Sequence, residues 1–405
     1  MKVALLTNMN NNYFVLMRYL REEGVDAHLF MAEDEHSHFL PENDTWNLEL
    51  WKPYIHTMPV KYYDISYLQK FDKEKLRNQL LPFDILMGSG PMPAYLEMCG
   101  LSLDLFFPYK TGIEYFDTPK AKFNLQLRRE TFFIEKLQKI GLSKTKECVN
   151  WDLRDITLSR LKVLITKINY CSVPMVFSET EPDVLSVDNR ITAIIGNLKK
   201  FSFVVCSASR HLWKKSWIDR LKHFGYDFIN NNANQHMIYA LDNLVKNHGA
   251  KDACLLFYEY GPHVKHSKEL ITKLGLDDYV FWMPLSPRKV ILYMHNFVHL
   301  GIGDIAVGGW GGKSIEYLSK GVPCINSISS EVEEFETYTK VPLPPFIKIK
   351  KPEELNAIFE KYYLDRDLLK SIAAKSKAWF DKYEGKNLAM KIQNIVERIV
   401  NEKRF

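Results

Sequence analysis

Six of the 19 glycines in this 405-residue chain fall between Gly301 and Gly312, and this cluster constrains the fold more than any other feature. An apolar run leads into the glycines, and a helical pattern of about two turns follows until Gly321 and Pro323 end it. The order predicts a strand, a tight turn and a helix N-terminus. Unpaired backbone N–H groups and the helix dipole attract phosphate there, and glycines let a bulky anion approach.

Glu316 falls in the first turn of this expected helix, where a carboxylate suits a ligand that presents hydroxyl groups as well as phosphate. We therefore predict an anion-binding site at 308–312, in which Gly309, Gly311, Gly312 and Lys313 contact phosphate and Glu316 accepts hydrogen bonds from a sugar. A tight turn with an ordinary glutamate that complements the helix dipole is the alternative.

Composition places the chain among ordinary globular proteins and argues for more than one domain. It is 46% hydrophobic and 25% charged, with a formal net charge of +5. This weak positive charge suits an anionic small molecule and falls short of a nucleic-acid-binding signature, while weak attraction to a membrane surface stays open. The six cysteines are scattered and have no metal-ligand spacing, so we expect buried thiols in the cytoplasm and no metal site.

Strand-like and helical patterns alternate along the chain in two sets. Continuous apolar runs, typical of strands buried in a parallel sheet, occur at 3–7, 25–31, 83–87, 104–108, 175–178, 201–206, 253–259, 279–283, 302–307 and 322–326. The pattern predicts an α/β protein with two doubly wound, Rossmann-like domains that face each other across a cleft. We expect an N-terminal domain at 1–190, a second domain at 191–375, and a C-terminal helix at 376–405 that packs back towards the first domain.

The second half resembles a known group of enzymes. Gly309-Trp310-Gly311 matches the Gly-Phe-Gly of the donor domain of GT-B-fold glycosyltransferases, particularly family 4, and Glu316 matches the second Glu of their Glu-x7-Glu motif. Arg210 and Lys215 have the family's Arg-x4-Lys spacing. The first Glu of the motif, which contacts the donor sugar in the family, is replaced here by Gly308. The resemblance covers about residues 195–400 and implies a GT-B fold and a nucleotide-sugar donor, with a uridine nucleotide the commonest in the family.

Arg210 and Lys215 suit such a donor because its diphosphate gains negative charge as the glycosidic bond breaks. Cations aimed at the leaving group stabilise the transition state more than the ground state, so we assign both residues, with Glu316, to catalysis. This pair can replace a metal ion, which implies a metal-independent enzyme. A solvated helix end is the alternative for the two cations.

The resemblance also implies that backbone groups at Met283 and Leu285 frame the nucleotide base. Pro284 stands between them where the family usually has glycine, so one backbone donor is missing.

Candidates for the acceptor side are polar residues that follow predicted strands of the first domain. Asn10, Asn11 and Asn12 follow the first strand and either contact a ligand or form an exposed loop. The cluster at 33–38 follows the second strand, and a carboxylate such as Glu35 or a histidine such as His36 is a candidate base there. The His-x-His pattern of His36 and His38 is a weak metal signal. Gly88 and Ser89 end a further strand at the same edge of the sheet.

Together these features predict a glycosyltransferase that uses a nucleoside diphosphate sugar and a carbohydrate or lipid-linked acceptor. Retention of anomeric configuration is implied only by the resemblance. Two alternatives stay open: a nucleotide-sugar 2-epimerase on the same fold, and a non-catalytic protein that binds sugar nucleotides. The sequence defines neither the acceptor nor the oligomeric state.

Overall fold

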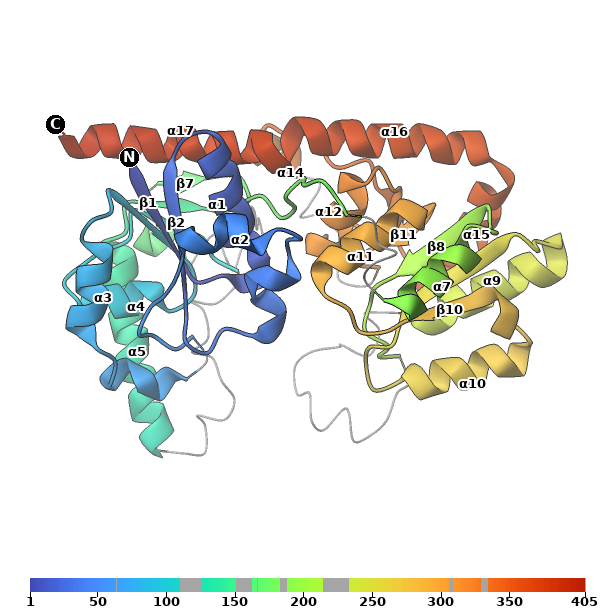
Figure 1. The fold of residues 1–405 in the computed structure, drawn as a ribbon, viewed down its shortest axis with the longest axis horizontal. Helices are drawn as coiled ribbons and strands as arrows, with labels where there is room; N and C mark the ends of the chain where they lie inside the picture. Colours follow the sequence, from blue (N-terminus) through green and yellow to red (C-terminus); the bar gives the residue numbers. More distant parts are fainter. Residues whose placement is uncertain are drawn as a thin grey trace. The chain divides into compact units, whose positions relative to one another are not determined.

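A computed structural model describes residues 1–62, 64–109, 125–150, 162–165, 167–182, 188–213, 233–305, 309–328 and 334–404. The chain divides into two compact units. Unit 1 comprises residues 1–178, 334–341 and 383–405, and unit 2 comprises residues 179–333 and 342–382. Each unit is built around its own parallel sheet, which confirms the predicted pair of α/β domains (Figure 1).

Unit 1 contains a seven-stranded sheet in the order β3-β2-β1-β4-β5-β6-β7, and all its pairings are parallel. The strands are β1 (Lys2–Leu6), β2 (Asp26–Met31), β3 (Ile55–Thr57), β4 (Ile85–Gly88), β5 (Leu105–Phe106), β6 (Glu147–Val149) and β7 (Ile168–Asn169). Apolar runs predicted four of them. The short strands β3, β6 and β7 have no such run, and the apolar stretch at 175–178 forms no strand.

Helices cover both faces of this sheet, because successive strand residues point to opposite sides. Val3 and Leu5 pack with residues of α1 (Asn12–Glu22) and of α17 (Gly385–Arg404). Ala4 and Leu6 pack on the other face with α3 (Lys73–Leu80), α4 (Met92–Met98) and α5 (Leu125–Ser143). Unit 1 also contains the short helices α2 (Leu48–Trp51) and α14 (Phe335–Thr339).

The C-terminal helix α17 therefore belongs to the core of the first unit. Its apolar side chains recur at helical spacing and are buried against α1 and the sheet: Leu388, Ile392, Ile395, Val396, Ile399 and Val400. Arg398 pairs with Glu147 of β6 at 2.5 and 2.7 Å, and Lys403 pairs with Asp104 at 2.8 Å. Charged as well as apolar contacts fix this helix to the unit.

Unit 2 contains a six-stranded parallel sheet in the order β10-β9-β8-β11-β12-β13. Its strands are β8 (Phe203–Ser207), β9 (Ala253–Tyr258), β10 (Val280–Met283), β11 (Leu300–Ile302), β12 (Cys324–Ser327) and β13 (Ile347–Ile349). Its helices are α7 (Asn189–Leu198), α9 (Asn234–His248), α10 (Val264–Leu274), α11 (Arg288–Met294), α12 (Gly312–Ser319), α15 (Leu355–Leu364) and α16 (Arg366–Tyr383). The predicted helix at 214–223 lies outside the described residues.

The unit boundaries differ from those predicted at residues 190 and 376. Unit 2 begins at Glu179 because Glu181 already contacts it: the carboxylate accepts a hydrogen bond from Asn296 at 2.7 Å and pairs with Lys320 at 2.5 Å. At the other end α16 is unbroken from Arg366, and Trp379 donates to the Pro342 carbonyl at 2.7 Å. Residues 376–382 are therefore part of unit 2.

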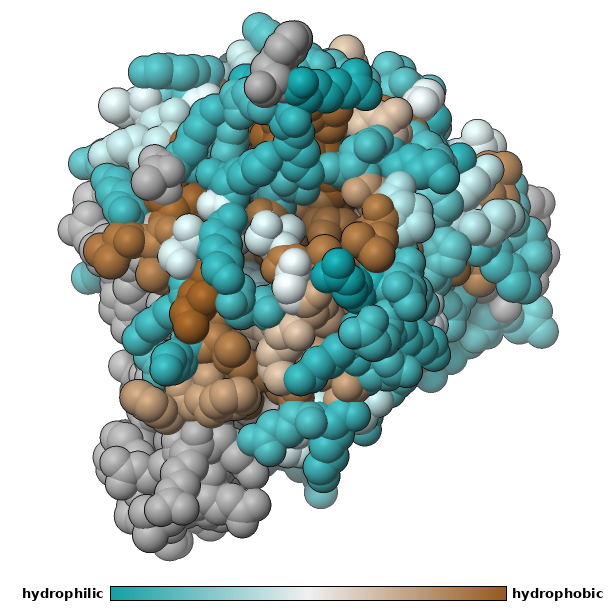
Figure 2. All heavy atoms as spheres, turned by 90° about the vertical axis from the view of Figure 1, so that its left-hand side faces the viewer, coloured by the Kyte–Doolittle hydropathy of each residue, from teal (hydrophilic) through white to brown (hydrophobic). Residues whose placement is uncertain are grey.

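The surface of unit 1 is mixed in character. Figure 2 shows hydrophobic side chains interrupted by hydrophilic ones on the face that it presents. The exposed large apolar residues of the unit include Leu50, Leu81 and Phe132. Within the described ranges, each helix is too short or too polar to cross a bilayer.

Candidate functional site

The glycine cluster lies at the carboxyl edge of the unit 2 sheet, between β11 and α12. Helix α12 begins at Gly312 after the extended N-cap residue Gly311, and Gly321 takes the predicted left-handed conformation with φ of 68° after the helix ends. A Cβ on Gly309 would meet no atom within 4 Å, so there is open space beside this turn. Gly308 lies outside the described residues.

Lys313 in the first turn of α12 joins three segments at this edge. Its Nζ donates to Ser209 Oγ at 2.7 Å, just beyond β8, and lies 3.4 Å from Asp304 Oδ1, just beyond β11. Parallel strands bring these loops together because their carboxyl ends share one edge of the sheet. The structure therefore places a partly buried cation beside the N-terminus of α12, where an anion would bind.

Glu316 lies in the second turn of α12, not in the first turn as the sequence suggested, because the helix begins only at Gly312. Its Oε1 accepts a hydrogen bond from Arg288 Nε of α11 at 2.6 Å, and both side chains are largely buried. Arg288 is thus the charged partner of Glu316. The helix dipole acts mainly within the first turn, so it has little effect on this carboxylate. An ionised carboxylate held at one oxygen keeps acceptor capacity for a ligand hydroxyl.

Uncharged aromatic groups lie beneath this pair. The ring centroids of His295 and Tyr317 are 4.3 Å apart, and both side chains are buried. Burial lowers the pKa of His295 to about 4, although the nearby Glu316 acts in the opposite direction, so the imidazole is neutral at pH 7. Burial also raises the pKa of Tyr258 and Tyr317 well above the usual value. The ion pair of Arg288 and Glu316 is therefore packed against buried side chains that carry no charge at pH 7.

Arg210 follows β8 at the same edge, and its guanidinium is exposed, 5.7 Å from the centroid of the Tyr260 ring. The backbone there is packed closely: His211 N donates to the Tyr260 carbonyl at 2.7 Å, and a Cβ on Gly261 would lie within 2.7 Å of two His211 backbone atoms. Lys215, the other predicted cation, lies outside the described residues. The structure thus places only Arg210 of that pair.

The segment predicted to frame a nucleotide base follows β10. The Met283 carbonyl accepts a hydrogen bond from Glu259 N at 2.8 Å, and the Pro284 carbonyl accepts one from Ser286 Oγ at 2.9 Å. Met283 is fully buried, whereas Leu285 is 71% exposed. Of the two predicted positions, only Leu285 is open to a ligand.

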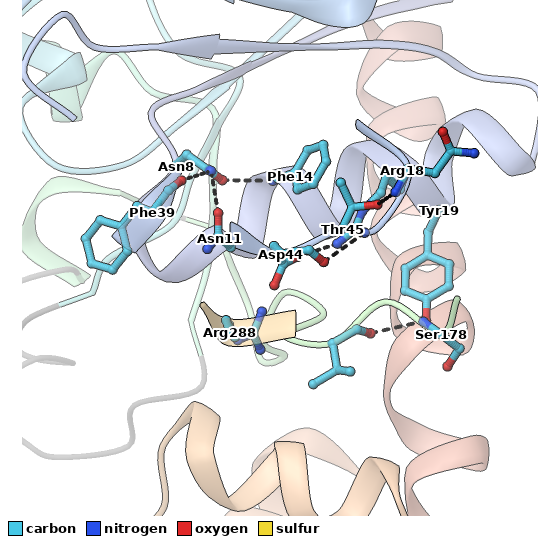
Figure 3. Close-up of polar contacts among 12 residues, drawn as sticks. Asn8, Asn11, Phe14, Arg18, Tyr19, Phe39, Asp44, Thr45, Ser178 and Arg288 are labelled. Carbon is cyan, nitrogen blue, oxygen red and sulfur yellow. Dashed lines mark hydrogen bonds and ion pairs between the residues drawn. The ribbon is translucent and has the colours of Figure 1, made fainter. Parts of the chain in front are cut away.

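The predicted acceptor-side residues meet at the carboxyl edge of the unit 1 sheet, where Asn8 makes the central contacts (Figure 3). Its Nδ2 donates to Asn11 Oδ1 at 2.9 Å and to the Phe39 carbonyl at 2.6 Å, and its Oδ1 accepts from Phe14 N at 2.9 Å. Asn11 also donates to the His38 carbonyl. These amides are buried and bind their own chain.

The other positions in this group divide between buried and exposed. Asn12 is the buried first residue of α1, and Asn10 is exposed. Gly88 and Ser89 are buried, and Ser89 shares a 2.7 Å hydrogen bond with Thr7. The loop after β1 is strained, because Thr7, Asn10 and Asn11 have φ values of 77°, 57° and 59°.

His36 is exposed and stacks on His38 with ring centroids 5.3 Å apart. The neighbouring Glu35 is the less ordinary group: burial raises the pKa of its carboxyl to about 7, while the Asn8 N–H, 3.2 Å from Oε2, acts in the opposite direction. Across the described part of the chain, no three His, Cys, Asp or Glu side chains are grouped so that they could hold a metal ion.

Two of these site residues, Asp304 and Arg288, were not among the sequence candidates. Asp304 lies inside the run 302–307 that was predicted as a strand, whereas β11 ends at Ile302, so its place beyond the strand end could not be predicted. Arg288 follows Pro287 at a helix start, where a cation is disfavoured by the helix dipole and so invites a specific partner. Glu35 lies in the cluster 33–38 from which a base was expected, but its burial could not be predicted because it involves contacts with the loop after β1.

Two parallel-sheet units with this strand order match the GT-B fold. Solved structures agree over almost the full length. HepE from Anabaena, in complex with UDP and glucose, is 14% identical with a TM-score of 0.62 and covers 98% of this chain and 100% of its own. Sucrose-phosphate synthase from Thermosynechococcus elongatus is 12% identical with a TM-score of 0.58, over 99% and 100%.

A putative UDP-N-acetylglucosamine 2-epimerase from Listeria monocytogenes is also similar, with 12% identity and a TM-score of 0.58 over 98% and 95% of the two chains. No protein-family model and no curated protein matches the sequence. The fold predicted from the sequence is thus confirmed as GT-B, whereas a narrower grouping within that fold, such as family 4, stays a prediction.

Proposed function

We propose that this protein is a glycosyltransferase that moves a sugar from a nucleoside diphosphate sugar to an acceptor hydroxyl. One observation carries the proposal: the carboxyl edge of the unit 2 sheet presents an open glycine turn, the N-terminus of α12, the Lys313 ammonium and the Glu316 carboxylate together. Phosphate suits the first three groups, and a ribose hydroxyl suits the fourth. The GT-B fold, shared with a protein solved with UDP and glucose, supports it.

In this reaction the bond between the sugar anomeric carbon and the diphosphate oxygen breaks, and the leaving diphosphate takes the electron pair. Positive groups aimed at that oxygen lower the barrier because they bind the transition state more strongly than the donor. Arg210 and Lys313, with the N–H groups that begin α12, are such groups in the described part of unit 2. We propose Lys215 as a further cation on the basis of sequence alone.

We further propose a uridine nucleotide as the donor, by analogy with the neighbour solved with UDP and glucose. We also propose a metal-independent reaction, supported by the cations at this edge. Unit 1 is proposed to bind the acceptor, a carbohydrate or a lipid-linked sugar, near its carboxyl edge, where the buried Asn8 and Ser89 hold the loops in shape. Six buried cysteines fit residence in the reducing cytoplasm.

Incubation with a panel of nucleotide sugars tests this proposal. Release of free nucleoside diphosphate, in the presence of acceptor mixtures or slowly by hydrolysis, and in EDTA as well as in magnesium, is the expected result. A changed sugar still attached to its nucleotide would instead identify an epimerase, the function that the Listeria neighbour favours. Binding of UDP without turnover of any donor would identify a sugar-nucleotide-binding protein.

A further inference from the structure

A carboxylate of this chain lies where the proposed function places the donor diphosphate. Asp304 Oδ1 is 3.4 Å from the Lys313 ammonium, and Oδ2 is 3.4 Å from the position of a Cβ on Gly311, the N-cap residue of α12. The carboxylate thus pairs with the cation and lies beside the helix N-terminus that would attract phosphate. Its side chain is one-third exposed, so an incoming anion would meet it directly.

The backbone fixes this carboxylate in place. Asp304 N donates to Asn326 Oδ1 at 2.8 Å, and the Asp304 carbonyl accepts from Ser327 N at 2.8 Å, so β12 holds the residue on both sides. A Cβ on the preceding Gly303 would lie within 2.5 Å of Asn326 and Ser314 side-chain atoms, which leaves the turn no freedom to move away. Asp304 can release Lys313 by rotating its side chain, but its charge stays at the site.

The consequence depends on the charge of the ligand. A diphosphate that binds Lys313 competes with Asp304 for the ammonium and then stays close to a fixed negative charge. A free nucleoside diphosphate carries about one more negative charge above pH 7 than the intact sugar nucleotide, because its terminal phosphate has a second ionisation near pH 6. The carboxylate therefore repels the released product more than the donor.

We propose that Asp304 is an internal competitor for the diphosphate, which weakens binding of the nucleoside diphosphate product more than binding of the donor. The inference rests on the proposed function and adds a specificity residue to that same site. In turnover, such a residue limits product inhibition, since the product leaves a site that still binds the donor.

Calorimetry with UDP and UDP-glucose, at pH 8 and low salt, tests the proposal with the Asp304→Asn variant. Asparagine keeps the size of the side chain and leaves both backbone hydrogen bonds intact. We expect UDP to bind about tenfold more tightly and UDP-glucose about threefold more tightly, with the gain shrinking at high salt. Unchanged or weaker UDP binding would overturn the proposal, as would weaker binding of UDP-glucose alone, which would make Asp304 a ligand of the sugar.

Asp278→Asn is the matched control, because it removes the same charge from an exposed position before β10, at the opposite edge of the same sheet. It should change neither affinity. In a Lys313→Ala background the gain from Asp304→Asn should fall to about threefold, since only repulsion is left to relieve. An undiminished tenfold gain would overturn the exchange of partners.

The measurements also separate the inference from the function on which it rests. If the folded wild-type protein and Asp304→Asn both fail to bind UDP and UDP-glucose, the proposed function and this inference fail together. If wild type binds UDP and Asp304→Asn does not improve it, only the inference fails.

Discussion

The carboxyl edges of the two sheets follow the same topology and present opposite chemistry. In unit 1 the edge is made of uncharged amides and hydroxyls that bind one another, with Asn8, Asn11 and Ser89 buried. In unit 2 the edge carries charged side chains that are only partly buried, such as Lys313 and Asp304. Buried amides that satisfy each other fix the shape of a loop, whereas exposed charges beside a helix N-terminus stay available to a ligand.

This difference predicts that the same kind of substitution affects stability at one edge and ligand binding at the other. The two units can be monitored separately by native-state hydrogen exchange, with the Leu5 amide for unit 1 and the Val205 amide for unit 2.

The largest effect is expected for Asn8→Ala. The variant loses three hydrogen bonds of a fully buried side chain, at about 1 kcal/mol or more each, so unit 1 should lose about 3–4 kcal/mol of stability. Exchange of the Leu5 amide should accelerate by more than a hundredfold, while Val205 and UDP affinity stay unchanged.

Asn10→Gly is the control for that variant, because Asn10 is exposed in the same loop and glycine accepts its positive φ. It should change the free energy of opening that the Leu5 amide reports by less than about 1 kcal/mol. An Asn8→Ala protein that keeps full protection of Leu5 but loses acceptor binding would show that the unit 1 edge is a ligand site like that of unit 2.

A smaller but purely functional effect is expected for Arg210→Ala. The exposed guanidinium contacts only the Tyr260 ring among the described residues, so stability should change by no more than about 0.5 kcal/mol. Donor turnover should fall about a hundredfold, by analogy with removal of one donor to a developing oxyanion. Steady-state kinetics should show the loss in kcat, with little change in donor affinity.

Lys251→Ala removes an exposed cation before β9, at the opposite edge of the same sheet, and should leave turnover unchanged. Equal kcat values for Arg210→Ala and wild type would mean that Arg210 is a solvated side chain after β8 with no role in turnover.

Glu316→Gln should lower UDP affinity about ten- to a hundredfold, since a hydrogen bond to a charged acceptor contributes about 1.5–3 kcal/mol. Because Arg288 holds the same carboxylate, Arg288→Ala should weaken UDP binding in wild type and have little further effect in the Glu316→Gln background. Calorimetry with UDP and 2′,3′-dideoxy-UDP measures both.

The dideoxy compound decides the role of Glu316, because it lacks the hydroxyls that the carboxylate is proposed to bind. Wild type and Glu316→Gln should bind it equally. A loss as large as that for UDP would mean that Glu316 only maintains the local structure of α12.

The sequence predicts the carboxyl edge of unit 2 better than that of unit 1, because the two edges depend on different kinds of sequence information. In unit 2 the information is local: Gly311, Lys313 and Glu316 lie on one short segment, so strand, turn and helix could be predicted together, and the anion site stays a prediction. The position of Glu316 was one turn in error because the helix start depends on the conformation of Gly311, which letters alone do not give. Its partner Arg288 could not be predicted, since the pairing joins two helices.

In unit 1 the information is mostly non-local. Four of the five predicted strands exist and the run at 175–178 forms none, while β6 and β7 are too short for a periodic pattern. The carbonyls that satisfy Asn8 and Asn11 come from the segment after β2. The asparagine run therefore gave two readings, a ligand contact or an exposed loop. The structure shows neither for Asn11, whose amide is buried in contacts within the chain.

The smallest expected effect is a pH dependence confined to unit 1. Burial raises the pKa of Glu35 to about 7, so the folded unit keeps this proton over a range in which the unfolded chain, with a pKa near 4.5, has released it. The raised pKa therefore contributes fully to the stability of the folded state below pH 4.5, and this contribution is lost as the pH rises through 7. Between pH 5 and pH 8 it amounts to about 2 kcal/mol.

Glu35→Gln should remove this dependence, because glutamine does not titrate. The measured quantity is the protection of the Leu5 amide in the variant minus that in wild type, at each pH and after correction for intrinsic exchange. This difference should be about 2 kcal/mol larger at pH 8 than at pH 5, while the Val205 amide shows no such change. Glu42→Gln, an exposed carboxylate further along the same segment, should give parallel profiles in both units. If the difference in Leu5 protection between Glu35→Gln and wild type were the same at every pH, Glu35 would be ionised throughout this range. The edge of unit 1 would then carry a charge beside Asn8.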